Sequence, residues 1–206
     1  MAHRIMHEKV QSKKEIANQA FTTTLKEVLK YEKSFLYPFD SLVTISRIYS
    51  PDNSFRIFNW ILEKEDGSYS YYALVHYHNK KRKRYEIIEL IDNSENIRRP
   101  TTKELADSNW YGALYYQIAY NKKKGRKYYT LLGWDGINAY STQKVIDVMY
   151  ISGKENIKFG LPIFLNETDT SHRVLLEHDE KTSISVRYQE KENRILFNHL
   201  VPLRPD

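Results

Sequence analysis

The most unusual local sequence of the chain is Gly133-Trp134-Asp135-Gly136, in which two glycines flank an aromatic ring and a carboxylate. Because glycine tolerates backbone conformations that other residues avoid, this spacing predicts a tight bend with positive φ at Gly133 or Gly136. An exposed Trp beside an Asp can stack on a sugar ring or on a cationic partner. The competing interpretation is a structural turn with Trp134 at least half buried, since large aromatic residues usually belong to the core. The candidate residues of this ligand- or partner-binding site are Trp134, Asp135, Tyr128 and Tyr140.

Two runs of basic residues could bind phosphate or another anionic group. They span residues 80–84 and 122–127, and without their ten Lys and Arg the chain keeps 22 basic residues against 26 acidic ones. The body of the protein is therefore mildly acidic, unlike a globally basic nucleic-acid-binding protein, and nucleic acid is not an expected partner. Polar, lysine-rich turns also discourage edge-to-edge aggregation, so we expect both runs to be exposed hairpin turns. The candidate anion-binding residues are Lys81, Arg82, Lys123 and Arg126.

Signatures of metal sites and of common catalytic centres are weak or missing in this sequence. His76 and His78 have the spacing that places two side chains on one face of a strand, but a zinc site needs three or four convergent ligands, so we expect no metal. The chain has no cysteine, which excludes thiol catalysis, thiolate metal ligands and disulfides. The phosphate-binding glycine loops, the G-x-S-x-G elbow and H-E-x-x-H are also absent, and no cofactor is expected.

An N-terminal helix is predicted over residues 10–32. Ser12 is the expected N-cap, with Glu15 as its capping-box partner. The apolar residues of this segment fall roughly on one stripe. They are Ile16, Ala20, Leu25, Val28 and Leu29. The dipeptide Tyr37-Pro38 ends the helical region, because a residue before proline avoids the helical conformation.

From residue 40 onward the hydrophobic period changes to two, which is typical of strands. The expected strands are 42–49, 54–63, 68–78, 85–91, 111–120, 127–133, 157–165, 172–178, 182–189 and 194–200. Along the third of them one face carries Tyr69, Tyr71, Ala73, Val75 and Tyr77. Residues 121–126 are expected to form a basic hairpin loop. Two short helical segments interrupt the strands, one after a capping box at residues 101–104 and one from Ser141 to about residue 148. The sequence thus predicts a mainly β (α+β) fold, an antiparallel meander that is sandwich- or barrel-like, in a single domain of residues 1–206.

Five aromatic segments are distinctive in combination. They are YPFDSL at 37–42, FRIFNW at 55–60, NWYGALYY at 109–116, YYTLLGWDG at 128–136 and FNHLVP at 197–202. They resemble segments of a family of uncharacterised, typically exported proteins of Bacteroidota-type bacteria, and the resemblance runs from about residue 15 to the end of the chain. It implies a periplasmic or envelope location, although residues 1–10 lack the apolar region of a signal peptide. It also implies that relatives continue past the equivalent of Asp206, so a C-terminal truncation is expected, and it implies no catalytic residues.

The function that we expect is a non-enzymatic binding or assembly module of the cell envelope, with a protein or a glycan as partner. The chain contains 17 Tyr and three Trp, and such residues are enriched at interfaces. The alternative is a carbohydrate-active or other hydrolase that uses Asp or Glu near Trp134, which needs two carboxylates roughly 5 to 10 Å apart across a cleft. Polyanion binding by the basic turns is the least favoured hypothesis. No segment approaches the roughly 18 apolar residues of a membrane span, and the sequence predicts no oligomeric state.

Overall fold

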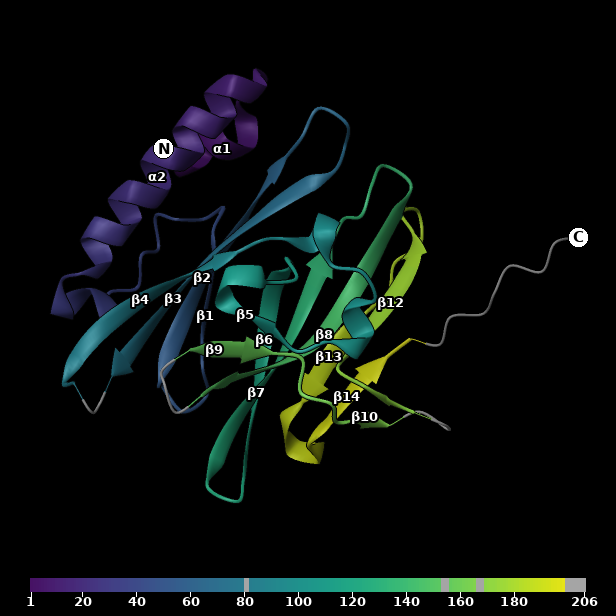
Figure 1. Cartoon of the computed structure of the whole chain (residues 1–206). Coiled ribbons are helices and arrows are strands. Elements are labelled where there is room, and N and C mark those ends of the chain that lie inside the picture. The colour runs from purple at the N-terminus through teal and green to yellow at the C-terminus, as the bar shows by residue number, and fades with distance from the viewer. Residues whose placement is uncertain (80–81, 153–155, 166–168, 199–206) are drawn as a thin grey trace, which may run out of the picture.

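The computed structural model describes residues 1–79, 82–152, 156–165 and 169–198, and it arranges them in layers (Figure 1). Two antiparallel sheets pack face to face, helices cover the outer face of the first sheet, and a hairpin covers part of the outer face of the second. Among the described strands neither sheet closes into a barrel. The predicted mainly β fold behind an N-terminal helix is confirmed, in its sandwich-like form.

The first sheet is a meander of four strands in sequence order. They are β1 (Ser46–Tyr49), β2 (Phe55–Glu63), β3 (Tyr69–Asn79) and β4 (Arg84–Ile91). The predicted strands at 54–63, 68–78 and 85–91 are confirmed to within one residue at each end. The strand predicted at 42–49 begins only at Ser46, because two turns precede it: the amides of Leu42 and Ile45 donate to the carbonyls of Phe39 and Leu42.

The second sheet has the order β5-β9-β8-β7-β6. Both β9 and β12 pair with the same edge of β8: β12 pairs with residues 141–147 and β9 with residues 149–151. The strands of this sheet are β5 (Leu105–Ala106), β6 (Leu114–Lys123), β7 (Arg126–Asp135), β8 (Ser141–Ile151), β9 (Ile157–Phe159) and β12 (Arg173–Asp179). The helix predicted from Ser141 is wrong, since this segment is β8. Val145 and Met149 face the first sheet and Ile146 faces the outer hairpin. With both faces covered, the strand shows a nearly continuous apolar run, which periodicity cannot distinguish from a helix.

Large aromatic residues fill the space between the two sheets. Tyr71 and Tyr77 of β3 point into this core, as the predicted alternation requires. Opposite them lie Trp110 and Tyr115, whose indole N–H and hydroxyl are joined by a hydrogen bond of 2.8 Å. Twelve of the 17 tyrosines are buried or partly buried. Most of the Tyr content that suggested an aromatic binding surface therefore serves packing.

The helical layer consists of α1 (Ala2–His7), α2 (Gln11–Leu29) and the 3-10 helix η1 (Glu32–Leu36), and no described helix is long and apolar enough to cross a membrane. The predicted Ser12–Glu15 capping box does not form: the N-cap is Val10, and Glu15 instead accepts a hydrogen bond from Gln11.

The buried face of α2 also differs from the predicted stripe. Ile16 is 67% exposed and Val28 is 37% exposed, whereas Phe21 is buried. Trp60 of β2 orients this face, because its indole N–H donates to Asn18 Oδ1 at 2.7 Å and Phe21 packs edge-on against its ring.

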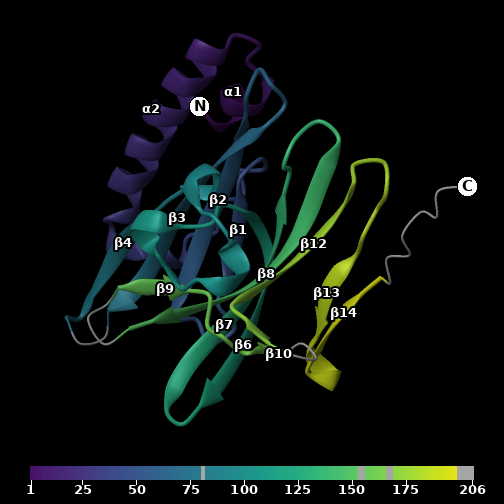
Figure 2. The same ribbon diagram turned by 45° about the vertical axis from the view of Figure 1, so that its right-hand side comes forward.

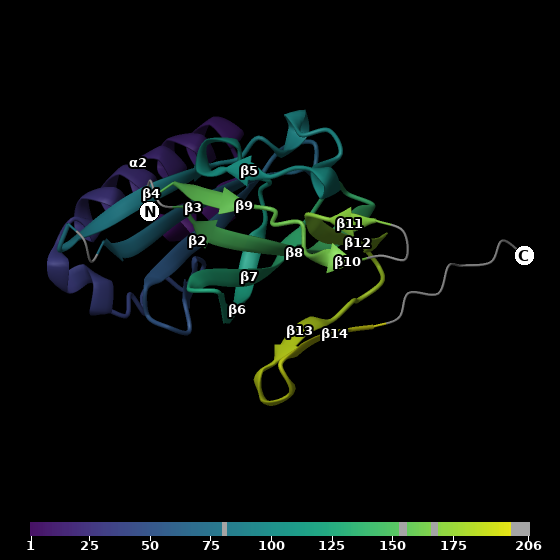
Figure 3. The same cartoon turned by 60° about the horizontal axis from the view of Figure 1, so that its bottom comes forward.

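The C-terminal part of the described chain forms small two-stranded units (Figures 2 and 3). β13 (Val186–Gln189) and β14 (Arg194–Phe197) form a hairpin over Leu132 and Ile146 of the second sheet, and β10 (Phe164–Leu165) pairs with β11 (Thr170–Ser171). The strand predicted at 157–165 is broken into β9 and β10, because Gly160 has a φ of +82°. The strand predicted at 172–178 is confirmed as β12. Those predicted at 182–189 and 194–200 are shorter, and residues 199–200 lie outside the described residues.

Short 3-10 turns link the two sheets. They are η2 (Ser94–Asn96), η3 (Pro100–Thr102) and η4 (Asp107–Asn109), and a fourth, η5 (Glu190–Glu192), lies between β13 and β14. The capping box predicted at residues 101–104 is wrong, because η3 has no side-chain cap and its N-cap residue Arg99 is left-handed, with a φ of 53°.

Candidate functional site

The strands β3 and β7 run the length of the sandwich and connect two chemically different ends. β3 begins at Tyr69 beside Trp134 of β7 and finishes at Asn79, which lines the same cavity as Arg126 at the start of β7. With about 3.3 Å per residue, the two ends are roughly 30 Å apart. We call them the aromatic end (turns 64–68 and 136–140 and loop 180–183) and the basic end (turns 50–54, 82–83 and 124–125). They form the upper and lower ends of the molecule in Figure 1.

A groove of about 440 Å³ at the aromatic end contains Trp134 and is called here the aromatic groove. The ring centroids of Trp134 and Tyr69 are 5.2 Å apart, with the rings tilted by 71°. Gly136 lies directly behind both rings, since a Cβ there would come within 2.5 Å of each. Close packing thus fixes the two rings. The other lining residues are Glu63, Gly67, Asn138, Ala139, Thr142, Lys144, His178, Glu180, Lys181, Thr182, Ser183 and Ile184.

The sequence around Trp134 is extended and does not form the predicted bend. Residues 133–135 belong to β7, and among the described glycines those with positive φ are Gly67, Gly125 and Gly160, so the prediction of positive φ at Gly133 or Gly136 is wrong. Glycine is required here by close contact: at Gly133 a Cβ would lie 2.9 Å from the ring of Tyr115. Trp134 is partly buried, in agreement with the competing structural interpretation.

Asp135 does not share the groove with Trp134, because neighbouring residues of a strand point to opposite faces. Its carboxylate is buried and accepts hydrogen bonds from the Tyr71 hydroxyl at 2.7 Å and from Gln143 Nε2 at 2.6 Å. The Tyr111 hydroxyl lies 3.4 Å away, and the Tyr71 hydroxyl also accepts from the Gly136 amide. Burial raises the pKa of Asp135, although these hydrogen bonds partly oppose the shift. The residue is the centre of a buried polar network and cannot act with Trp134 on one ligand.

Charged and hydrogen-bonding side chains surround the aromatic rings of the groove. Glu63 and Glu180 supply carboxylates, and Lys144 supplies an ammonium group that lies 5.4 Å from the centroid of the Tyr116 ring. Burial lowers the pKa of Lys144. The groove therefore combines an apolar floor with donors and acceptors at its sides, which is the usual composition of a small-ligand site.

The structure separates the four residues proposed for this site. Only Trp134 lines the aromatic groove. Tyr140 is 83% exposed on the neighbouring turn, and Tyr128 packs near Tyr150, with 6.3 Å between ring centroids, towards the basic end. The ring that packs against Trp134 is Tyr69, which the sequence did not identify as its partner. Alternation along β3 predicted only that Tyr69 lies on the inner face, and its contact with Trp134 depends on tertiary packing.

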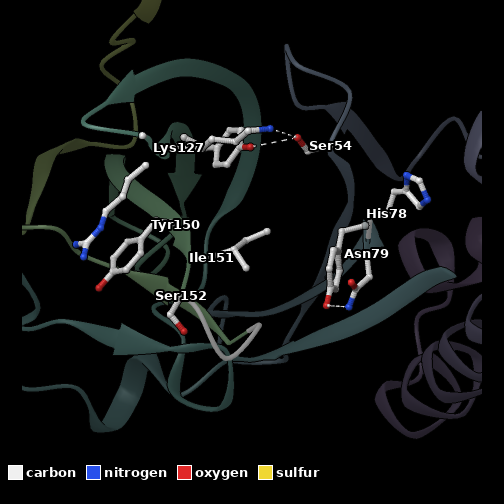
Figure 4. A pocket seen from close by; sticks show the side chains of 11 residues that line it. Ser54, His78, Asn79, Lys127, Tyr150, Ile151 and Ser152 are labelled. Atoms are coloured by element: carbon white, nitrogen blue, oxygen red, sulfur yellow. Dashed lines mark hydrogen bonds between the residues drawn. The ribbon is translucent and has the colours of Figure 1, made fainter. Parts of the chain in front are cut away.

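The basic end holds a larger cavity, of about 660 Å³, between the ends of the two sheets (Figure 4). The lining residues are Ser54, Tyr77, His78, Asn79, Gly125, Arg126, Lys127, Tyr129, Tyr150, Ile151 and Ser152. Lys127 points across to the first sheet, where its Nζ lies 2.5 Å from Asp52 Oδ2 and 3.0 Å from Ser54 Oγ. Partial burial of Asp52 works against ionisation, but hydrogen bonds from Lys127, Ser54 and Ser50 hold the pKa of this carboxyl at about 2.

The proposed anion-binding residues take different positions at this end. Lys81 lies outside the described residues, and Arg82 forms an ion pair with Glu86 at 3.0 Å. Lys123 and Arg126 are a cross-strand pair, so the loop predicted at 121–126 is only the two-residue turn Lys124-Gly125, in which both residues have positive φ. The described residues of both runs lie at hairpin turns and are exposed, as predicted. Of the three described residues among these four, only Arg126 lines the cavity.

The two histidines of β3 do not form a metal site with other described residues. His76 is buried, neither ring nitrogen has a hydrogen-bond partner among the described residues, and its cross-strand neighbour is Arg56. Burial and the Arg56 charge lower the pKa of His76 to about 4. The His78 ring stacks on Tyr85, 4.7 Å between centroids, and points away from the basic-end cavity in Figure 4. In the described part of the chain no group of three or more His, Asp or Glu side chains is placed to hold a metal ion.

Two hollows formed by the described residues thus lie at opposite ends: an aromatic groove with polar sides, and a cavity with an arginine at its rim. Comparison with known proteins does not help to choose between these sites. No family model matches the sequence, and neither curated proteins nor solved structures gave a significant match.

Proposed function

We propose that the protein is a non-enzymatic binding module that holds a glycan in the aromatic groove. The observation that carries the proposal is the pair Tyr69–Trp134, fixed by Gly136 at the floor of an open groove. A sugar ring presents an apolar face that packs on such rings and hydroxyl groups that hydrogen-bond to polar side chains. Glu63, Lys144 and their polar neighbours supply these partners.

Binding without turnover is favoured by the position of Asp135, the carboxylate next to Trp134 in the sequence. Asp135 is turned into the core and saturated by donors, so it stabilises the end of β7 and does not meet a substrate. A fixed aromatic floor also reduces the entropy lost when a ligand binds. The proposal places this module in the periplasm or cell envelope, a location supported by the resemblance of the aromatic segments to exported proteins.

Intrinsic tryptophan fluorescence tests the proposal, because Trp134 is the accessible one of three tryptophans. Trp60 is 1% exposed and Trp110 is 0% exposed. We expect titration with tetra- to hexasaccharides of glucose, N-acetylglucosamine, mannose or xylose to change the emission of Trp134 saturably for at least one of them. Tyr69→Ala should abolish the effect while leaving Trp134 in place as the reporter.

Tyr140→Ala is the matched control, since Tyr140 is an exposed aromatic on the adjoining turn and does not line the groove. Its affinity should equal that of the unmodified protein. Equal losses in Tyr69→Ala and Tyr140→Ala, or no response to any sugar, would rule out glycan binding in this groove. A response only to a protein partner, lost in Tyr69→Ala, would reassign the same groove to protein recognition.

A hydrolase is the second candidate, because Glu63 and Glu180 both line the aromatic groove. Both residues are exposed, whereas the general acid of a glycosidase usually sits in an apolar environment. Release of reducing ends from the oligosaccharide that binds would decide between the two functions. If turnover is observed and disappears in Glu63→Gln or Glu180→Gln while binding is retained, the protein is an enzyme and the proposal of a non-enzymatic binding module is wrong.

A further inference from the structure

The two basic runs are about 40 residues apart in the sequence, but the fold brings them to the same end of the molecule. The turn between β3 and β4 carries Arg82 and Lys83, and the hairpin of β6 and β7 carries residues 122–127. Figures 1 and 2 both show these two hairpin tips at one end of the sandwich. The cavity of about 660 Å³ opens between them and is lined from both sides, by Asn79 and by Arg126.

Ion pairs engage three of the cationic groups at the basic end. Arg82 and Arg84 both contact Glu86, at 3.0 and 2.9 Å, and Lys127 contacts Asp52 at 2.5 Å. Arg126 is different: it lines the cavity, and among the described residues its guanidinium has no ion-pair partner. Among the described residues that line the cavity, Arg126 is therefore the cation available for a ligand.

The remaining wall of the cavity is largely uncharged. Tyr150, Ile151 and Ser152 line one side, and Asn79 lies opposite them, as Figure 4 shows for these labelled side chains. The hydroxyl of Tyr150 is 2.5 Å from Glu104 Oε2, which holds its ring in place. A volume in the range of small-molecule sites, roughly 300 to 1,000 Å³, with one cation and an apolar wall, fits a compact ligand with one charged group.

We propose that this cavity binds a small organic anion, whose phosphate, sulfate or carboxylate group pairs with the guanidinium of Arg126 and whose uncharged body packs on Tyr150 and Ile151. The planar guanidinium matches two oxygens of such a group at once. The exposed lysines of the two turns are not ligand contacts. They raise the local concentration of anions at the mouth, an effect that salt screens.

A polyanion is the less suitable ligand, because it needs a continuous row of cations along its path. Near the cavity, Arg82 and Arg84 share the carboxylate of Glu86 and Lys127 pairs with Asp52, so two of these three positive charges are offset. A guanidinium at the rim of the cavity, without an ion-pair partner among the described residues, favours one anionic group.

Backbone amide shifts in a ¹⁵N-labelled sample test the proposal with phenyl phosphate, phenyl sulfate and benzoate as probes and with benzamide as the neutral control. We expect saturable shifts at Gly125, Arg126 and Ser152 with at least one anion, and none at Trp134. Arg126→Gln should weaken binding at least about tenfold, because it removes a charge-assisted hydrogen bond. Since Arg126 is exposed, this variant should keep the melting temperature of the unmodified protein.

Lys123→Gln is the matched control, because Lys123 faces Arg126 across the hairpin, is exposed and does not line the cavity. The same change of charge there should reduce affinity less than about threefold, and this reduction should vanish in high salt. Equal losses in the two variants, or binding of heparin but of none of the small anions, would show a diffuse basic surface and overturn the proposal. Absence of shifts for all three anions at about 10 mM would overturn it as well.

Discussion

The aromatic and basic ends of the sandwich are built on the same strands, yet they are organised by different physical forces. At the aromatic end, glycines allow close contacts: Gly67 meets Ala139 and Gly136 meets the rings of Tyr69 and Trp134. At the basic end Gly125 has nothing within 4 Å of a Cβ position, and charged side chains project from the turn. Packing specifies the first end, whereas turn geometry and electrostatics specify the second.

The two carboxylates at these ends show the same difference. Asp135 is buried among hydroxyl and amide donors, and Asp52 is partly buried in an ion pair with the exposed Lys127. Burial raises the pKa of Asp135, while hydrogen bonds and the neighbouring charge lower that of Asp52 to about 2. One fold therefore contains an acid that resists ionisation and an acid that favours it, at opposite ends.

The largest contrast is expected from removal of these carboxylates. Asp135→Ala leaves the hydroxyl of Tyr71 and the amide of Gln143 without their buried acceptor, and we expect it to lower the free energy of unfolding by about 2 to 4 kcal/mol. Asp52→Ala breaks a pair in which Asp52 is partly buried and Lys127 is exposed, and it should cost about 1 kcal/mol. Urea unfolding of both variants measures the two values. Similar costs would contradict the distinction between a packed and a charged end.

Alanine at two glycines tests packing against backbone strain. Gly136→Ala drives a methyl group into two rings that the fold holds in place, and overpacking of this kind costs about 1 to 3 kcal/mol. Gly125→Ala meets no atom, but Gly125 has a φ of +78°, so it should cost about 1 kcal/mol. Gly136→Ala should also change the fluorescence of Trp134, and Gly125→Ala should not. If Gly136→Ala changes neither the free energy of unfolding nor the fluorescence of Trp134, the two rings can move aside and are not fixed by packing.

The opposite pKa shifts predict opposite pH dependences. The pKa of Asp52 is lower in the folded state, so its contribution to stability is present above the ordinary value of 3.8 and is lost as pH falls through about 2. The pKa of Asp135 is raised, so its contribution is present below 3.8 and is lost as pH rises through the folded-state value. Melting temperatures of Asp52→Asn and Asp135→Asn, relative to the unmodified protein between pH 2 and 8, should therefore diverge in opposite directions.

Local sequence patterns predicted much of the β body. Alternation identified the long strands of the first sheet and the inward face of β3 from Tyr71 to Tyr77, because one face of that strand lies against the core. Turn residues placed the hairpins correctly at residues 65–67 and near Gly125. The same pattern failed at β8, which is covered on both faces and so has no polar side to reveal its period.

The candidate sites could be predicted only in part, because each depends on contacts between distant segments. Trp134 was identified from its unusual neighbours, but Tyr69 comes from another sheet and only packing reveals it. Asp135 looked like a partner of Trp134 until strand geometry placed it in the core. The basic runs were evident in the sequence, whereas their convergence on one cavity, with Arg126 as the available cation, required the three-dimensional arrangement.

The smallest effect is expected from the lysines of the basic turn. Replacing Lys122, Lys123 and Lys124 with Ser removes three exposed charges that form no ion pair with described residues, and should change the free energy of unfolding by less than about 1 kcal/mol. At low salt the variant should be slightly more stable than the unmodified protein, because repulsion between the three lysines is removed. This gain in stability should disappear near 0.5 M salt, where the screening length falls to roughly 4 Å. Melting curves at both salt concentrations measure it. A loss as large as that expected for Gly136→Ala would mean that these side chains pack, and the basic end would then resemble the aromatic one.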